Sequence, residues 1–178
     1  MARLILLLGP AASGKSAHAV SLGRRDPGPC AFLATARALD DEMAEKIRRH
    51  RAERPPDWTT VEEPEDLAGA LDRLGGEGVR FCVVGSVTVW IGQLLAAGEE
   101  GARVEGRLAA LLDSVAHFEG TVVCVSDEVG AGVVPDNPLA RAFRDVAGRC
   151  HRKIAAAADR VLWFVAGIPH LIKGGGES

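Results

Sequence analysis

The stretch Gly9-Pro10-Ala11-Ala12-Ser13-Gly14-Lys15-Ser16 decides the fold of this chain. It has the spacing G-x-x-x-x-G-K-[ST] and follows an apolar run, Leu4 to Leu8, that is typical of a buried parallel strand. A strand, a glycine turn and a helix N-terminus in this order form a phosphate cradle, because loop N–H groups and the helix dipole favour an anion there. We therefore predict a nucleoside triphosphate site in which residues 9–16 hold the phosphates. Lys15 reaches the β- and γ-phosphates, and Ser16 is a ligand of Mg²⁺.

Length and composition narrow the class of protein. The 178 residues suit one domain, 1–178, with a disordered tail at 174–178. A net charge of −3 argues against a general nucleic-acid binder, and no apolar run reaches the 18 residues of a membrane span. The four cysteines have no metal-binding spacing and fit a reduced compartment. We expect a cytoplasmic protein that binds small molecules.

Short apolar runs alternate with helical patterns along the chain, and this alternation predicts an α/β fold with a mainly parallel sheet. Five runs are expected as strands: Leu4–Leu8, Cys30–Ala34, Phe81–Val84, Thr121–Val125 and Val161–Val165. The clearest helix runs from Pro138 to about Ala158, with Asn137 as its cap and an apolar face made by Leu139, Phe143, Val146, Cys150, Ile154 and Ala157. Ligands of such folds bind beyond the carboxyl ends of the strands.

A histidine stands among arginines after the second expected strand. Met43, Ile47 and His50 share one helix face, and Arg48, Arg49, Arg51 and Arg54 surround the histidine. Neutral imidazole is a nucleophile toward phosphorus, and neighbouring arginines can stabilise a phosphoryl-transfer transition state. A histidine on an apolar face is more often part of the core, and an arginine-rich helix is usually a solvated face, so these residues alone favour that interpretation over a nucleophile.

Further segments match one family in order and spacing. They are Ala34-Thr35-Ala36, Asp40-Asp41-Glu42-Met43, His50-Arg51, Arg54-Pro55, Trp58, Thr60, Glu62, Thr88, Leu94-Leu95, Ser126–Pro135, Leu139-Ala140-Arg141, Phe143-Arg144-Asp145, Gly148-Arg149, Ala158-Asp159, Ala166–Pro169 and Lys173. With the phosphate loop, these motifs resemble the bifunctional adenosylcobinamide kinase / adenosylcobinamide-phosphate guanylyltransferase family of cobalamin biosynthesis.

The resemblance implies a RecA-like P-loop NTPase sheet, a homotrimer and two reactions. A nucleoside triphosphate, ATP or GTP, phosphorylates adenosylcobinamide. GTP then guanylylates a histidine, and the GMP passes to adenosylcobinamide phosphate to give adenosylcobinamide-GDP. The position that matches the guanylylated histidine is His50, with Lys15 as the second catalytic residue. The nucleotide-binding residues implied beside the phosphate loop are Ala34, Thr35, Ala36, Arg51, Arg54 and Glu62.

The chain departs from the family pattern at positions that bear on activity. Gly85 stands where the family carries the acidic residue of the Walker B strand, which with Ser16 organises Mg²⁺. Ala12 replaces an arginine of the phosphate loop, and Asp127 replaces an asparagine. His151-Arg152 replaces an Asn-Gln pair.

These departures leave several interpretations open. The protein is an active enzyme whose metal is organised through Asp40, Asp41, Glu128 or water, or it has kept only one activity. It can equally be a nucleotide-binding relative without catalysis, or another small-molecule kinase on the same scaffold.

Overall fold

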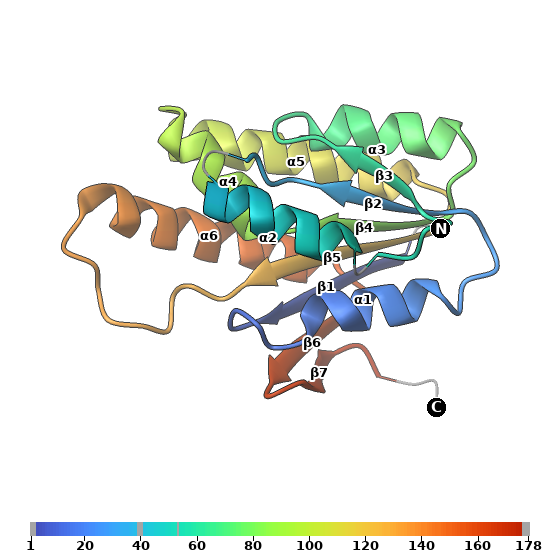
Figure 1. Cartoon of the computed structure of the whole chain (residues 1–178). Coiled ribbons are helices and arrows are strands. Elements are labelled where there is room, and N and C mark those ends of the chain that lie inside the picture. Colours follow the sequence, from blue (N-terminus) through green and yellow to red (C-terminus); the bar gives the residue numbers. More distant parts are fainter. Residues whose placement is uncertain (1–2, 39–40, 53, 176–178) are drawn as a thin grey trace.

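A single seven-stranded sheet runs through the computed structural model, which describes residues 3–38, 41–52 and 54–175 (Figure 1). The strand order is β3-β2-β4-β5-β1-β6-β7. The strands are β1 (Arg3–Gly9), β2 (Cys30–Ala34), β3 (Thr59–Glu62), β4 (Phe81–Gly85), β5 (Thr121–Asp127), β6 (Arg160–Val165) and β7 (Ile168–Lys173). All neighbouring strands are parallel except β7, which pairs with β6 in the antiparallel sense. The predicted α/β class and mainly parallel sheet are confirmed.

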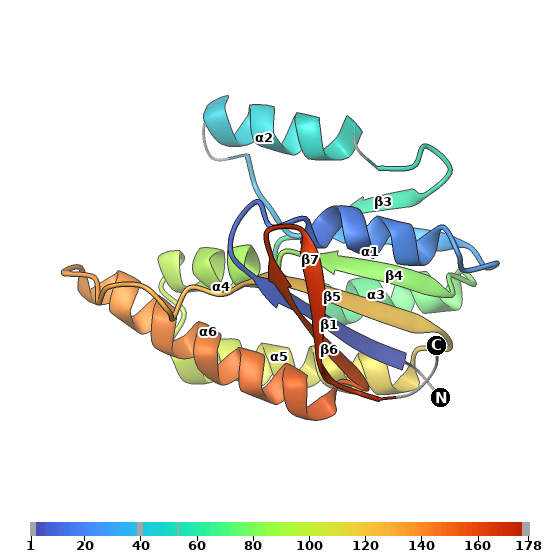
Figure 2. The ribbon, with the colours of Figure 1, turned by 90° about the horizontal axis from the view of Figure 1, so that it is seen from below.

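Helices cover both faces of the sheet. They are α1 (Lys15–Gly23), α2 (Asp41–Ala52), α3 (Leu67–Gly76), α4 (Val87–Ala96), α5 (Gly101–His117) and α6 (Pro138–Ala157). Figure 2 shows α1 and α2 on one side of the sheet and α3, α4, α5 and α6 on the other. Two buried apolar clusters match these layers, the larger one beneath α3 to α6 and the smaller one beneath α1.

The leucine run before the phosphate loop serves both faces of the sheet. Leu4, Leu6 and Leu8 belong to the larger cluster, whereas Ile5 and Leu7 belong to the smaller one. Because β1 lies between β5 and β6 and is covered on both faces, every one of these side chains is buried. A continuous apolar run, and not an alternating one, is therefore what this position requires.

Three elements were not expected from the sequence. β3 is short and only partly buried, every residue of β7 is exposed, and α4 is apolar on most of its surface. The long helix begins as predicted, because the Asn137 side chain accepts hydrogen bonds from Leu139 N (2.8 Å) and Ala140 N (3.3 Å). Its predicted apolar face was wrong at both ends, where Leu139 and Ala157 are exposed. Of the expected tail, residues 176–178 lie outside the described residues.

Candidate active site

A pocket of about 590 Å³ lies over the carboxyl ends of the parallel strands. The phosphate loop, α1, α2 and the ends of β2, β3, β4 and β5 all contribute to its walls. The predicted site residues that line it are Ala11, Ala12, Ser13, Gly14, Lys15, Ser16, Ala34, Ala36, His50, Arg54 and Glu62. The fold therefore brings most of the predicted nucleotide site, including the candidate nucleophile, to one cavity.

Four predicted binding residues do not line the pocket. Gly9 and Pro10 begin the phosphate loop, and their carbonyl oxygens accept hydrogen bonds from Lys15 Nζ. Thr35 is fully buried, and its hydroxyl donates to the Ser86 carbonyl oxygen at 2.9 Å. Arg51 is largely exposed and lies 3.4 Å from Glu62. These residues support the pocket wall in this structure and do not form it.

The phosphate loop has the backbone shape that its glycines predict. Gly14 takes a left-handed conformation (φ 89°) just before α1 begins at Lys15, a conformation that glycine adopts without steric cost. A Cβ on Gly9 would lie 2.9 Å from the Phe164 carbonyl oxygen, so only glycine fits between β1 and β6 there. The first turn of α1 carries no acidic residue. Its N-terminus therefore keeps the positive end of the helix dipole open to an anion.

Lys15 is buried within the loop, with 5% of its surface exposed. Its Nζ atom donates to Gly9 O at 3.0 Å, to Pro10 O at 2.5 Å and to Ser13 Oγ at 3.1 Å. The same atom lies 2.8 Å from Asp127 Oδ1. The ammonium group is thus held by three oxygens of its own loop and by one carboxylate from the end of β5.

In the sequence, Asp127 is only a departure from the family pattern, whereas the structure places it in the candidate site. It lies directly beside the phosphate loop because β5 is paired with β1, with Asp127 opposite Gly9 in register. Gly85 ends the next strand, β4, one strand further from the loop. The signal that could have identified Asp127 is an acid at the carboxyl end of an apolar strand, but its position relative to the loop depends on the strand order.

Glu128 points away from the phosphate loop. Its Oε1 atom accepts a hydrogen bond from Gly130 N at 2.5 Å, and Oε2 lies 3.8 Å from His151 Nδ1. Glu128 does not line the pocket. Of the other carboxylates considered for the metal, Asp41 is exposed at the start of α2, and Asp40 lies outside the described residues.

A buried polar network holds the backbone around Asp127. Thr88 Oγ1 accepts a hydrogen bond from Asp127 N at 2.7 Å and lies 3.0 Å from the Asp127 carbonyl oxygen. It also lies 2.5 Å from Ser126 Oγ, which is in turn 2.8 Å from His151 Nε2. Burial lowers the pKa of His151, with Glu128 and Asp127 opposing that shift. The network links α4, β5 and α6 beneath the phosphate loop.

Two residues that line the pocket outside the phosphate loop have polar atoms without a partner in the described part of the chain. The Arg54 guanidinium lies over the Phe32 ring, 4.1 Å from its centroid, and burial lowers the pKa of this arginine. Among the described residues, Arg54 Nε and Ser86 Oγ are buried without a hydrogen-bond partner. Both residues line the pocket, where a bound polar molecule or water can supply the missing partners.

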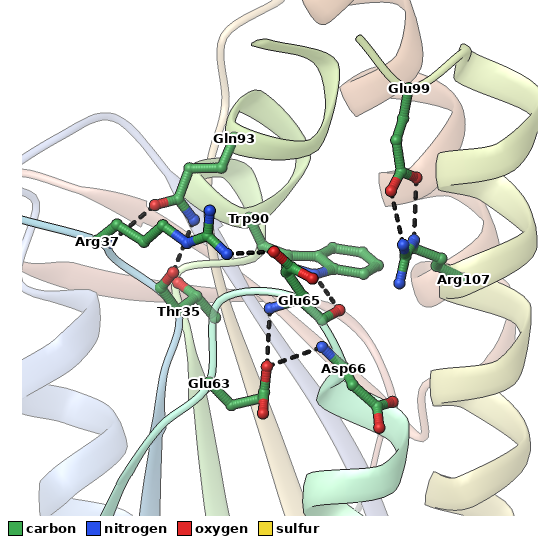
Figure 3. Close-up of polar contacts among 9 residues, drawn as sticks. All are labelled: Thr35, Arg37, Glu63, Glu65, Asp66, Trp90, Gln93, Glu99 and Arg107. Carbon is green, nitrogen blue, oxygen red and sulfur yellow. Dashed lines mark hydrogen bonds and ion pairs between the residues drawn. The ribbon is translucent and has the colours of Figure 1, made fainter. Parts of the chain in front are cut away.

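The segment that leads from β2 into α2 is fastened to α4, as Figure 3 shows. Gln93 Nε2 donates to Thr35 O at 2.7 Å, and Arg37 N donates to Gln93 Oε1 at 2.8 Å. Trp90 Nε1 donates to Glu65 O at 3.0 Å, and Glu65 forms an ion pair with Arg37. The start of the connection to the His50 helix is therefore fixed to the protein core through one glutamine amide.

The fold and the loop define the class of protein, an α/β phosphate-loop protein with a ligand pocket over its strand ends. The family model described as cobinamide kinase / cobinamide phosphate guanyltransferase matches residues 5–172, so the chain belongs to this family of enzymes. The resemblance found in the sequence is confirmed.

Named relatives match over nearly their whole length. The chain is 41% identical over 169 residues to the bifunctional adenosylcobalamin biosynthesis protein CobP of Pseudomonas aeruginosa, covering 95% of this chain and 96% of that protein. It is 36% identical to the bifunctional adenosylcobalamin biosynthesis protein CobU of Salmonella typhimurium, covering 96% of this chain and 99% of the relative. CobU of Escherichia coli is 37% identical, with the same coverage. Within the described residues, no helix is both long and apolar enough to span a membrane.

Proposed function

We propose that this protein phosphorylates adenosylcobinamide and then transfers GMP from GTP to adenosylcobinamide phosphate, with adenosylcobinamide-GDP as the product. The observation that carries the proposal is that the phosphate loop and His50 line the same pocket. A phosphate loop by itself fits any nucleoside triphosphate enzyme. A histidine in the same pocket adds the nucleophile that a covalent nucleotidyl transfer needs.

In the kinase step, a hydroxyl oxygen of adenosylcobinamide attacks the γ-phosphorus of ATP or GTP, and the bond to the β-phosphate bridging oxygen breaks. The loop N–H groups and Lys15 hold the negative charge on the phosphates during this transfer. Lys15 Nζ must therefore turn from the loop carbonyls, where it lies 3.0 Å from Gly9 O, toward the pocket. The hydroxyl proton leaves to solvent or to a product phosphate oxygen.

In the guanylyltransferase step, a ring nitrogen of His50 attacks the α-phosphorus of GTP, and the bond to pyrophosphate breaks. A phosphate oxygen of adenosylcobinamide phosphate then attacks the same phosphorus, and the histidine–phosphorus bond breaks. Arg54 lines the pocket on the His50 side, and its buried Nε has no partner among the described residues. A donor at this place can stabilise the charge that develops on the transferred phosphoryl group.

Mg²⁺ fits the donors of this pocket. Ser16 of the phosphate loop, Asp127 and Ser86 all line the pocket. Hydroxyl and carboxylate oxygens suit this hard cation, which is bound through one or two protein groups together with the phosphates. Mg²⁺ bound to the phosphates would neutralise part of their charge during transfer. Among the described residues, no cluster of three or more histidine, cysteine or acidic side chains offers a separate metal cage.

The proposal includes a homotrimer working in the cytoplasm. The β6–β7 hairpin supports an assembly because it exposes Val165 and its cross-strand partner Ile168, and also Leu171 and Ile172 further along β7. Apolar side chains gathered on an edge strand are typical of a surface that a partner covers. Light scattering of the purified protein would report a mass three times that of the 18.7 kDa chain.

Product analysis tests the function. Incubation with adenosylcobinamide, Mg²⁺ and ATP should yield adenosylcobinamide phosphate, and addition of GTP should convert it to adenosylcobinamide-GDP, both identified by mass spectrometry. The His50→Ala variant should stop at the phosphate, and Lys15→Ala should lose the phosphorylation. Nucleotide hydrolysis without any corrinoid product would instead indicate a different small-molecule kinase.

A further inference from the structure

In the part of the chain that the structure describes, no carboxylate stands at the carboxyl end of β4, which is separated from β1 and the phosphate loop by β5. Gly85 occupies that place and has no side chain to offer a metal. A Cβ built on Gly85 would lie 3.1 Å from the Phe32 ring, so a side chain at this position requires the ring to shift by a few tenths of an ångström. A carboxylate that meets the Mg²⁺ on the phosphates beside Ser16 has to come from another position.

Two acidic residues line the described part of the pocket, Glu62 and Asp127. Glu62 ends β3, the edge strand, and its carboxylate lies 3.4 Å from Arg51. Three strands, β2, β4 and β5, separate β3 from β1 and its phosphate loop. Asp127 instead lies on the strand that adjoins β1, with its carboxylate 2.8 Å from Lys15 Nζ. By its position, Asp127 and not Glu62 is the candidate to meet the Mg²⁺ on the phosphates.

We infer that Asp127 replaces the missing carboxylate and holds the Mg²⁺ of the bound nucleotide together with Ser16, directly or through a bound water. This inference rests on the proposed function. One third of the Asp127 side chain is exposed, toward a pocket that also reaches Ser16. The carboxylate is therefore accessible to a cation and not sealed in the core.

The ion pair between Lys15 and Asp127 indicates what each charged group does when a nucleotide binds. Lys15 must turn outward to reach the phosphates, and that movement separates it from the carboxylate. Asp127 then faces a triphosphate with its negative charge unpaired, which is unfavourable unless a cation lies between them. Asp127 therefore makes nucleotide binding depend on the metal.

The backbone of Asp127 is positioned for this role. The Thr88 hydroxyl contacts both the amide nitrogen (2.7 Å) and the carbonyl oxygen (3.0 Å) of Asp127. Thr88 and Ser126 are themselves buried. A metal ligand held by buried hydrogen bonds at the end of a strand is kept in place when the charge of the site changes.

Metal-dependent nucleotide binding tests the inference without any turnover. The affinity for a fluorescent GTP or ATP analogue is measured with Mg²⁺ and again with EDTA, for the unmodified protein and for Asp127→Asn. The asparagine variant should lose about tenfold or more of the Mg²⁺ enhancement. Its metal-free affinity should be equal or higher, because a negative charge facing the phosphates has gone. Electron paramagnetic resonance with Mn²⁺ should show a matching loss of protein-bound metal.

A purely structural role predicts a different result for the Mg²⁺ enhancement. If Asp127 only held Lys15, the asparagine variant would keep the full Mg²⁺ enhancement, whatever its metal-free affinity, and this would overturn the inference. Glu128→Gln is the matched control, since its amide oxygen can still accept from Gly130 N, and it should behave like the unmodified protein. If the Gly85→Asp/Asp127→Asn double variant regains the Mg²⁺ enhancement of nucleotide affinity, this result would support the inference that Asp127 replaces a carboxylate at position 85. Failure of the unmodified protein to bind either nucleotide would refute the proposed function, and the inference with it.

Discussion

His151 Nε2 lies 2.8 Å from Ser126 Oγ, at a buried contact between α6 and β5. This contact joins the helix to the strand that carries Asp127, one residue after Ser126. Only 5% of His151 is exposed, and its Nδ1 atom has no hydrogen-bond partner among the described residues. A second proton on this ring would be buried with Glu128 as the nearest compensating charge, 3.8 Å away.

The lowered pKa of His151 predicts a loss of stability in acid. Below the ordinary histidine pKa, 6.5, the unfolded chain binds a proton that the folded protein does not, so the free energy of unfolding falls as pH falls. One such group contributes a slope of up to about 1.4 kcal/mol per pH unit. Chemical denaturation between pH 7.5 and 5.5 should show a shallower slope in His151→Gln than in the unmodified protein.

His18 also has a lowered pKa, so the difference between the two proteins is the quantity to compare and not either slope alone. His117→Gln, at the exposed end of α5, controls for the general effect of replacing a histidine by glutamine. Equal slopes in His151→Gln and the unmodified protein would show that His151 does not set the acid sensitivity.

Arg54 is expected to act through its planar group and not only through its charge. Its guanidinium lies over the Phe32 ring at 4.1 Å, a contact worth about 1 kcal/mol that lysine reproduces poorly. Arg54→Lys should therefore weaken GTP binding roughly fivefold, as measured by titration with a fluorescent analogue. Arg73→Lys, on α3 at the opposite face of the sheet, should leave the affinity unchanged. Unchanged GTP affinity in Arg54→Lys would show that Arg54 acts only through its positive charge.

Gln93 positions the segment that leads to the His50 helix. Gln93→Leu keeps the approximate size of the side chain but removes both hydrogen bonds, to Thr35 O and from Arg37 N. The loss should cost about 1–2 kcal/mol of stability, because two backbone groups lose their partner. It should also slow labelling of the enzyme by GTP severalfold more than it slows phosphorylation of adenosylcobinamide. Arg37→Ala removes an exposed ion pair and should cost under about 1 kcal/mol.

Elements that have a clear local sequence pattern were predicted correctly. The Leu4–Leu8 run is β1, and Asn137 caps α6 as expected. β7 was not predicted because an exposed antiparallel edge strand needs no apolar run. β3 was not predicted because it is a short, half-exposed edge strand. α4 is buried around Val87, Trp90, Ile91 and Leu94, so a mostly apolar sequence conceals its helical period.

The candidate site also has a part that could be predicted from local sequence and a part that could not. The phosphate loop is contiguous in sequence, so its contribution to the pocket could be predicted from its spacing. That His50 lines the same pocket depends on how α2 lies over the sheet, and the sequence indicated it only through the family resemblance. Asp127 depends on the order β4-β5-β1, which places one strand end against the loop and Gly85 one strand further away. No pattern within a single segment contains that information.

In the proposed guanylyltransferase step, His50 carries GMP as a covalent intermediate. GTP labelled at the α-phosphate, incubated with the protein and Mg²⁺, should leave an acid-labile label on the unmodified chain. His50→Ala should carry no label while still binding GTP, and His117→Ala should be labelled as fully as the unmodified protein. Label at full strength on His50→Ala would contradict the account.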